Sequence, residues 1–239
     1  MIDTIMLFAA GFGNRMRHLT ENNPKTLITV LGKSMLHNAL ELCRSYKFKR
    51  IVINTHYLHT QIVKSVKDFQ VLNPSFPEIV IIYEEELLET GGAIKNAIKL
   101  LGMQPIFTLN TDIILKSDRN IFEYMIKNWK PEIMDFLLLM QNYNKAVGYS
   151  GHGDFDLGLT GKLSRPDKEE NYDFMYAGLS ILKPKVVAKH PLTIFSLKEY
   201  YLNSDKVRGV EAKNVRWYHA SSPEDLINIE MDMLAKGDE

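Results

Sequence analysis

The sequence has one cysteine, Cys43, among its 239 residues, so no disulfide can form within the chain. A lone cysteine fits a reducing compartment. Cys43 lies on the apolar face of a predicted helix, where a small buried hydrophobe is expected rather than a nucleophile. No apolar run reaches membrane-spanning length, and the chain does not open on a basic-then-apolar secretory pattern. We therefore expect a cytoplasmic protein with no membrane partner.

The sequence also lacks a net charge, because 29 Lys and Arg residues balance 29 Asp and Glu residues. No overall electric field therefore favours nucleic acid as a partner. The composition, 45% hydrophobic and 24% charged, is that of a globular protein. We find no linker, repeat or low-complexity segment. One compact domain over residues 1–239 is expected, and the oligomeric state is expected to be a monomer or a small homo-oligomer.

Short apolar runs alternate with helical patterns in the first part of the chain. Strands are expected at residues 4–8, 50–54, 79–83, 106–110 and 135–140, and helices at 58–68, at 92–101 and after a Ser34 cap. Continuous apolar strands separated by helices indicate a parallel sheet covered on both faces. The predicted fold class is α/β, with a Rossmann-like, doubly wound and mostly parallel sheet.

Beyond residue 135 the segments become shorter and glycines interrupt them. Strands are expected at 176–182 and 215–218 and a helix at 194–202. A last helix begins after Ser222, with Pro223 at its first position and acids in its first turn, and runs to about residue 236. We expect a small mixed-β second half, 135–239, lying over a nucleotide-binding first half, 1–134.

The most informative stretch directly follows the first strand. Gly11 and Gly13 allow the backbone to turn sharply and to approach a ligand closely. Successive N–H groups in such a turn form an anion-binding concavity. Arg15 can fork onto phosphate oxygens, and Lys25 supplies a second cation at the end of the same loop. This combination points to a polyphosphate.

Two better-known phosphate motifs do not fit. A dinucleotide fingerprint needs a third glycine at position 16, where the chain has Met16. Gly32-Lys33-Ser34 imitates the end of a P-loop, but the glycine required five residues earlier is Leu27.

Other polar groups follow the predicted strands, at the sheet edge where ligands bind in such folds. They are Asn54, the run Glu89-Thr90-Gly91-Gly92, and Asn110-Thr111-Asp112. Asp112 is either a Mg²⁺ ligand or a turn residue bonded to local backbone. The glycine run is either a surface for a planar base or an ordinary helix entry. Asp154, in the second half, is either a partner for sugar hydroxyls or one more loop carboxylate.

These motifs, in their order along the chain, resemble those of the sugar-1-phosphate nucleotidylyltransferases. The resemblance rests on Ala9-Ala10-Gly11-x-Gly13-x-Arg15-Met16, Pro24-Lys25, Glu89-Thr90-Gly91-Gly92, Asn110-x-Asp112, Gly153-Asp154-Phe155 and Ala177-Gly178-Leu179. The subgroup it resembles most is the compact N-acetylmuramate-1-phosphate uridylyltransferases of cell-wall recycling. Mannose-1-phosphate guanylyltransferases are an alternative. The resemblance implies the nucleotide-diphospho-sugar transferase fold, with a nucleoside triphosphate and a sugar 1-phosphate as partners.

The resemblance also implies residue roles. Catalysis would fall to Arg15, on the β- and γ-phosphates, to Lys25, toward the α-phosphate, and to Asp112, on Mg²⁺ or Mn²⁺. From the resemblance, and for Asn54 from its place at the end of a strand, we expect nucleotide contacts from Ala9, Ala10, Gly11, Gly13, Asn54, Glu89, Gly91, Gly92 and Asn110. The sugar would be bound by Asp154 and Gly178.

One position departs from the family pattern. Trp217-Tyr218-His219 places a histidine where the family has a second metal-binding aspartate, so His219 is a possible metal ligand. A nucleotide-sugar-binding protein with lost or weak turnover is therefore the rival expectation to an active enzyme.

Overall fold

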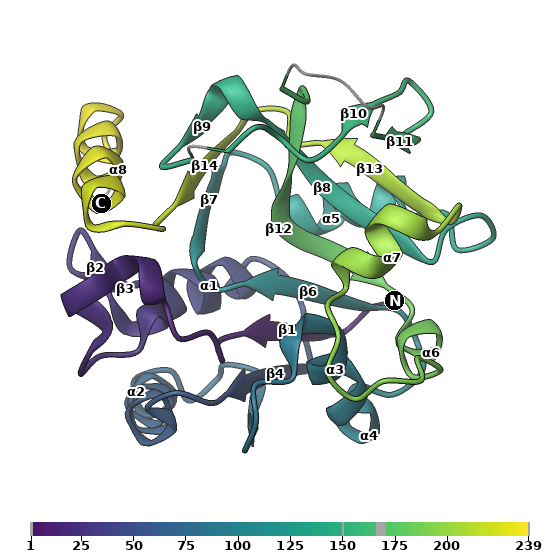
Figure 1. Ribbon diagram of the computed structural model, residues 1–239. Coiled ribbons are helices and arrows are strands. Elements are labelled where there is room, and N and C mark those ends of the chain that lie inside the picture. The colour runs from purple at the N-terminus through teal and green to yellow at the C-terminus, as the bar shows by residue number, and fades with distance from the viewer. Residues whose placement is uncertain (1, 150, 166–170, 239) are drawn as a thin grey trace.

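A seven-stranded sheet is the centre of the structure. The structure is a computed structural model, and it describes residues 2–149, 151–165 and 171–238, except for the side chain of Arg17. The strand order is β13-β8-β12-β6-β1-β4-β5 (Figure 1). The strands are β1 (Thr4–Phe8), β4 (Arg50–Thr55), β5 (Glu78–Tyr83), β6 (Ile106–Asn110), β8 (Phe136–Asn142), β12 (Phe174–Leu182) and β13 (Val207–Glu211). Strand β12 runs antiparallel to β6 and β8, and the other neighbours pair in parallel. The predicted mostly parallel α/β sheet is confirmed.

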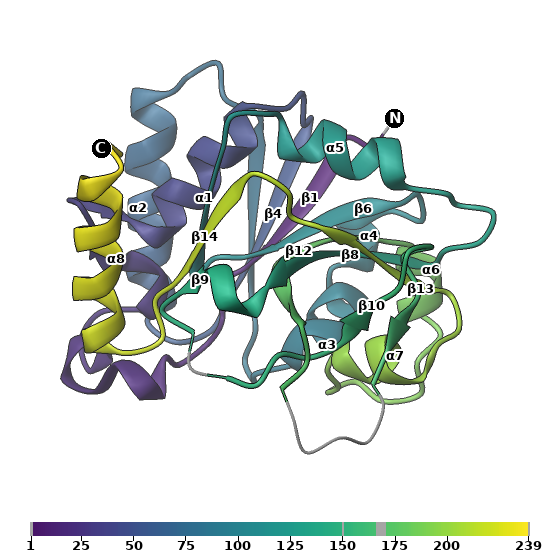
Figure 2. The same ribbon diagram turned by 90° about the horizontal axis from the view of Figure 1, so that it is seen from above.

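Helices cover both faces of this sheet (Figure 2). The helices on one face are α1 (Met35–Arg44), α2 (His59–Leu72) and α5 (Ile121–Asn128), and those on the other are α3 (Glu89–Asn96), α4 (Ile98–Leu101), α6 (Pro184–Val187) and α7 (Lys198–Asn203). Strand β1 shows why both faces are apolar. Its Ile5 and Leu7 belong to the hydrophobic core on one face of the sheet, and Met6 between them belongs to the core on the other face.

A smaller sheet lies beside the first and contributes to the site. It has the order β7-β14-β9, with β7 (Ile113–Ser117), β14 (Val215–His219) and β9 (Ala146–Val147). The C-terminal helix α8 (Pro223–Ala235) packs next to it (Figure 1). As predicted, Ser222 caps α8, and the cap is completed by Asp225 in a reciprocal capping box.

The remaining elements are short. They are the 3₁₀ helices η1 (Asn14–Thr20), η2 (Lys25–Leu27) and η3 (Tyr143–Lys145), and the two-residue strands β2 (Thr29–Val30), β3 (Lys33–Ser34), β10 (Asp156–Leu157) and β11 (Leu163–Ser164). The described part of the chain contains no helix with the length and apolar character needed to cross a bilayer.

Two predicted helices differ from the structure. The helix expected at 194–202 is wrong in its first part, because α7 begins only at Lys198. The helix expected at 92–101 starts earlier, at Glu89, and is interrupted at Ala97 between α3 and α4. Strands from both predicted halves share the large sheet, since β8, β12 and β13 come from residues after 134.

Candidate active site

The glycine loop leaves β1 and enters η1, and its two glycines have different surroundings. Gly13 has a φ of 71°, and a Cβ there would lie 2.7 Å from the Lys25 Cβ. Gly13 thus lets the loop pack against the segment that carries Lys25. A Cβ on Gly11 would meet nothing within 4 Å, because Gly11 faces open space. Room for a ligand therefore lies at Gly11.

A cavity of about 320 Å³ opens at this point, where the parallel strands end. We call it the nucleotide cavity, after the ligand that we expect there from the sequence. Its wall is formed by Phe8, Ala9, Ala10, Gly11, Lys25, Thr26, Asn54, Leu87, Glu89, Thr90, Asn110, Thr111 and Asp112. Eight of the predicted site residues are thus brought together, although they come from segments far apart in the sequence.

Asn54 holds the start of the glycine loop in place. Its Oδ1 accepts the backbone N–H of Ala9 at 3.2 Å, and its Nδ2 donates to Glu84 Oε1 at 2.9 Å. Glu84 Oε2 in turn accepts the N–H of Leu88 at 3.2 Å. Burial raises the pKa of the Glu84 carboxyl, although the hydrogen bonds from Asn54 and Leu88 oppose this shift. The amide of Asn54 is therefore engaged by protein groups and acts as a support for the loop.

Asp112 lies at the centre of the charged groups in the cavity. Its Oδ2 is 2.6 Å from Lys25 Nζ and 3.4 Å from His219 Nε2. The imidazole reaches this point because β14 pairs with β7 and places His219 opposite Ile113. Burial alone would raise the pKa of Asp112, but the Lys25 charge and the contact with His219 hold it well below its usual range. The carboxylate is thus ionised and available to a cation.

The donor set suits Mg²⁺ only in part. Mg²⁺ is commonly held by one or two carboxylates together with substrate phosphates and water. Asp112 supplies one carboxylate beside a cavity wide enough for phosphates. Within the described residues no group of three His, Cys, Asp or Glu side chains could hold a metal ion. A metal at Asp112 would therefore depend on the nucleotide for most of its remaining ligands.

The packing around Gly91 and Gly92 leaves no room for a side chain at either position. A Cβ on Gly91 would lie 2.3 Å from the Phe195 ring, and one on Gly92 would lie 2.2 Å from the Thr193 carbonyl oxygen. Their N–H groups donate to the Phe195 carbonyl at 2.9 and 3.1 Å. The segment around Phe195 therefore packs closely against both glycines, and neither glycine is among the residues that line the nucleotide cavity.

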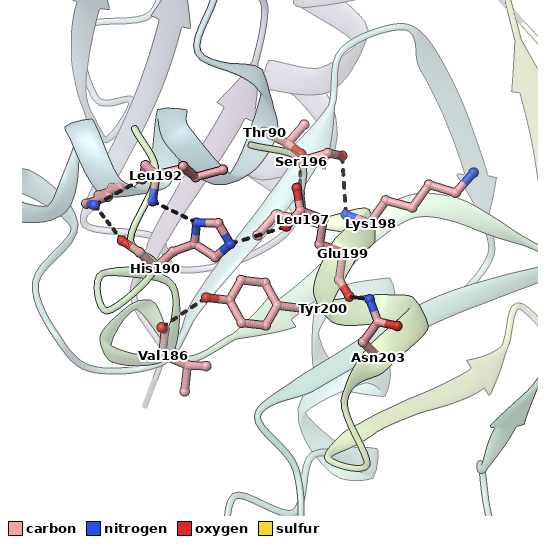
Figure 3. A network of polar contacts seen from close by, with 11 residues as sticks. Thr90, Val186, His190, Leu192, Ser196, Leu197, Lys198, Glu199, Tyr200 and Asn203 are labelled. Carbon is pink, nitrogen blue, oxygen red and sulfur yellow. Dashed lines mark hydrogen bonds and ion pairs between the residues drawn. The ribbon is translucent and has the colours of Figure 1, made fainter. Parts of the chain in front are cut away.

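A network of polar contacts holds that segment against α3 (Figure 3). Leu197 N donates to Thr90 Oγ1 at 2.9 Å, which connects the start of α7 to the glycine run. His190 stacks on Phe195 with ring centroids 3.7 Å apart, and its Nε2 lies 3.2 Å from Glu199 Oε2. Its Nδ1 accepts from Leu192 N at 3.3 Å, so Nε2 carries the proton and donates to Glu199 in this arrangement. The glycine run and the 190–199 segment thus form one unit.

A second cavity, of about 180 Å³, adjoins the first and shares Phe8, Thr90 and Asn110 with it. We call it the sugar-side cavity. Asp154, which we expect to bind the sugar, is on its wall. The Asp154 Oδ2 accepts the N–H of Tyr176 at 2.9 Å, so the carboxylate is held in position by the backbone of β12.

Four predicted site residues lie outside both cavities besides Gly91 and Gly92. Gly13 faces the segment that carries Lys25, Arg15 is exposed on η1, and His219 contacts Asp112 from the neighbouring sheet. Gly178 has a φ of 81° at an irregular point of β12, where a Cβ would lie 3.2 Å from the Asn110 Cβ. Gly178 therefore permits a close approach to the residue that lines both cavities.

Several residues in or next to the cavities were not predicted as site residues, because the sequence around them has no clear motif. Thr26 lies on the nucleotide cavity, and its buried Oγ1 has no hydrogen-bond partner among the described residues. Its position next to Lys25 was the available clue. Glu84 is the first of three consecutive glutamates, and nothing in the sequence distinguishes the one that is buried. Leu87 had no distinguishing pattern, and Thr111 was noted only as part of the polar run that follows the strand at 106–110.

The sequence model of the family described as "Nucleotidyl transferase" matches residues 4–234. The chain belongs to this family. N-acetylmuramate alpha-1-phosphate uridylyltransferase of Caulobacter vibrioides is 33% identical over 224 residues, which cover 92% of each chain. The protein of the same name from Neisseria meningitidis serogroup B is 32% identical over 76% of this chain and 75% of its own.

Solved structures share the fold at lower identity. HddC from Yersinia pseudotuberculosis, complexed with GMP-PN, has a TM-score of 0.77 at 20% identity and covers 97% of this chain and 100% of its own. UDP-glucose pyrophosphorylase complexed with UDP-glucose has a TM-score of 0.77 at 14% identity, with 99% and 100% covered. The predicted resemblance to sugar-1-phosphate nucleotidylyltransferases and the predicted fold are confirmed, and the chain is an enzyme of this nucleotidyl transferase class.

Proposed function

We propose that this nucleotidyl transferase transfers the uridylyl group of UTP to N-acetylmuramate 1-phosphate, releasing pyrophosphate. The observation that carries the proposal is the pair Lys25–Asp112 beside the open glycine loop, with a second cavity continuing past Asn110 toward Asp154. The names of the two relatives at 32% and 33% identity support this choice of base and sugar. A role in cell-wall recycling follows from that substrate.

In this reaction a phosphate oxygen of the sugar 1-phosphate attacks the α-phosphorus of UTP. The new P–O bond forms as the bond from the α-phosphorus to the bridging oxygen breaks, and pyrophosphate leaves with both electrons of that bond. The N–H groups at Gly11 face the triphosphate, with Arg15 nearby on η1. Lys25 neutralises charge at the α-phosphate. Catalysis is then positioning and charge stabilisation.

Asp112 would hold Mg²⁺, which supplies positive charge to the phosphates when bound. Asn54 keeps Ala9 at the start of the loop. Asp154, fixed by Tyr176 N, accepts a hydrogen bond from the sugar. Glu89 and Asn110 line the nucleotide cavity and contact the nucleoside.

A rival function is favoured by His219. An imidazole beside Asp112 supplies neither the charge nor the hard oxygen of a second carboxylate, so a nucleotide-sugar-binding protein with weak turnover is the alternative. Transfer of a guanylyl group to mannose 1-phosphate is less well supported. The mannose-1-phosphate guanyltransferase of Pichia angusta matches only 50% of this chain, at 30% identity.

Pyrophosphate release decides between these functions. The protein is mixed with Mg²⁺ or Mn²⁺, one of UTP, GTP or CTP, and one of N-acetylmuramate, N-acetylglucosamine or mannose 1-phosphate. We expect the highest kcat/KM with UTP and N-acetylmuramate 1-phosphate. Binding of UDP-sugars without pyrophosphate release in any combination would establish the binding protein instead.

A further inference from the structure

Lys198 is a cation on the wall of the sugar-side cavity that has no partner among the described residues. Among the described residues that line this cavity it is the sole Lys or Arg. Its Nζ makes no hydrogen bond or ion pair with any described residue. Other lysines near the site are already engaged, since Lys25 pairs with Asp112 and Lys95 donates to the carbonyls of His190 and Leu192. The charge of Lys198 is therefore free for a ligand.

The backbone fixes the position of Lys198 although its side chain is exposed. Lys198 is the first residue of α7, and its N–H donates to Ser196 Oγ at 3.2 Å. The preceding residue, Leu197, donates to Thr90 Oγ1. The Lys198 side chain extends away from the His190–Glu199 network that holds the segment (Figure 3). The backbone of Lys198 is thus anchored, through Leu197 and Thr90, to a wall of the nucleotide cavity. Its side chain takes no part in the network beside it.

The two cavities separate the charges that an acidic sugar phosphate would meet. Lys25 and Asp112 line the nucleotide cavity, where the reacting phosphate must lie to reach the α-phosphorus. Lys198 lines the sugar-side cavity, together with the Asp154 carboxylate and the apolar side chains of Phe155 and Leu197. An anion facing Lys198 is therefore a second anionic group, carried by the sugar itself.

We propose that Lys198 binds a carboxylate on the sugar and so selects a carboxylate-bearing sugar 1-phosphate over its neutral counterpart. This rests on the proposed function, in which N-acetylmuramate carries a lactyl carboxylate that N-acetylglucosamine lacks. Asp154 accepts a hydroxyl or amide hydrogen at the same time, and the apolar wall contacts the methyl groups. An ammonium suits this task because it is a point charge on a flexible stem.

The test compares UDP-N-acetylmuramate with UDP-N-acetylglucosamine, each titrated by calorimetry, in wild type and in Lys198→Gln. The parent protein is expected to bind the acidic ligand about tenfold more tightly, the usual size of one charge-assisted hydrogen bond. Lys198→Gln should remove this preference, because it should weaken the binding of the acidic ligand and leave the binding of the neutral ligand unchanged. Lys198→Arg should keep most of it. Lys127→Gln, on α5 and outside both cavities, is the matched control and should bind both ligands as wild type does.

Steady-state kinetics with UTP and the two sugar 1-phosphates give a second readout. Lys198→Gln should raise KM for N-acetylmuramate 1-phosphate about tenfold and leave kcat and the KM of the neutral sugar unchanged. An equal loss for both sugars would assign Lys198 to the shared phosphate and overturn the proposal. So would a wild type without preference for the acid, or a Lys198→Gln protein that keeps it. Failure of the proposed function is seen separately, as no pyrophosphate release with either sugar.

Discussion

Lys25 Nζ lies 2.6 Å from Asp112 Oδ2, and 87 positions of the chain separate the two residues. Without a ligand, the ammonium thus occupies one oxygen of the carboxylate that we propose for Mg²⁺. A triphosphate gives Lys25 a competing partner, because phosphate oxygens attract the ammonium as the carboxylate does. Nucleotide binding and metal binding should therefore support each other at Asp112.

Lys25→Met tests this coupling. We expect turnover to fall about 10²- to 10³-fold, the usual loss for one preorganised charge-stabilising group. Mn²⁺ should bind the nucleotide-free variant more tightly than wild type, since the competing cation is gone, and calorimetric Mn²⁺ titration measures this. Lys183→Met is the matched control, because Lys183 pairs with Asp135 at 2.7 Å in a similarly buried ion pair away from the site. Weaker Mn²⁺ binding by Lys25→Met would contradict the competition.

Gly11→Ala and Gly91→Ala should fail in opposite ways. A Cβ at Gly11 meets nothing in the free protein, so stability should be unchanged while triphosphate affinity falls. A Cβ at Gly91 meets the Phe195 ring at 2.3 Å, and overpacking of this kind costs about 1–3 kcal/mol. Urea unfolding and UTP titration of both variants check this. A loss of stability in Gly11→Ala would contradict the open space at Gly11, and unchanged stability in Gly91→Ala would contradict the close packing of Gly91 against Phe195.

Thr26→Val should affect ligand binding without harming the fold. The Thr26 hydroxyl is buried on the nucleotide cavity without a partner among the described residues, so replacing it by a methyl group removes an unsatisfied polar atom. Thermal unfolding should show equal or higher stability, and KM for the triphosphate should rise about 3- to 10-fold if the hydroxyl contacts a phosphate.

Thr108→Val is the matched control for Thr26→Val. The Thr108 hydroxyl is equally buried but lies 2.6 Å from Ser180 Oγ, so its loss should cost about 1 kcal/mol and leave KM unchanged. An unchanged KM in Thr26→Val would remove Thr26 from the site.

Glu84 should make the stability of the native state depend on pH. Its folded pKa is raised, chiefly by burial, so the native state binds the proton more strongly than the unfolded chain. Relative to Glu84→Gln, which does not titrate there, wild type should therefore gain free energy of unfolding as the pH falls from 7 toward 5. Urea unfolding of both proteins at pH 7, 6 and 5 measures the difference. A difference that is constant, or that shrinks at lower pH, would contradict the raised pKa.

The sequence was informative wherever the structure is decided locally. Strands β1 and β6 have the predicted bounds because their continuous apolar runs are buried in the core, and Ser34 caps α1 as its side chain predicted. Strand β13 was missed because Val207–Glu211 has no strong pattern of its own and is a strand through its pairing with β8. Residues 194–197 are not helical, since the Phe195 carbonyl is needed by the N–H groups of Gly91 and Gly92.

The same division applies to the site. The glycine loop could be recognised because its turn depends on residues that are neighbours in the sequence. The ion pair of Asp112 with Lys25 could not, because it requires η2 to pack behind Gly13. The approach of His219 to Asp112 was implied only by the family resemblance, since it requires β14 to pair with β7. The true surroundings of Gly91 and Gly92 likewise depend on a segment about 100 residues later in the chain.

His219→Asp should change the metal preference of the enzyme. His219 Nε2 is 3.4 Å from Asp112 Oδ2, so it faces the point where a metal on Asp112 would lie. Imidazole nitrogen suits Mn²⁺ better than Mg²⁺, and a carboxylate oxygen suits Mg²⁺. We therefore expect Mn²⁺ to support higher turnover than Mg²⁺ in wild type, and His219→Asp to lower the Mg²⁺ concentration needed for half-maximal rate.

His219→Asn separates this ligand effect from a change of shape, because it matches the aspartate in size and adds no charge. It should leave Mg²⁺-supported turnover low. The alternative is that His219 only packs against Asp112 or contacts a phosphate while water completes the metal's shell. In that case all three proteins would share one order of metal preference. Pyrophosphate release over a range of Mg²⁺ and Mn²⁺ concentrations distinguishes the two, and an unchanged preference in His219→Asp would exclude the imidazole as a metal ligand.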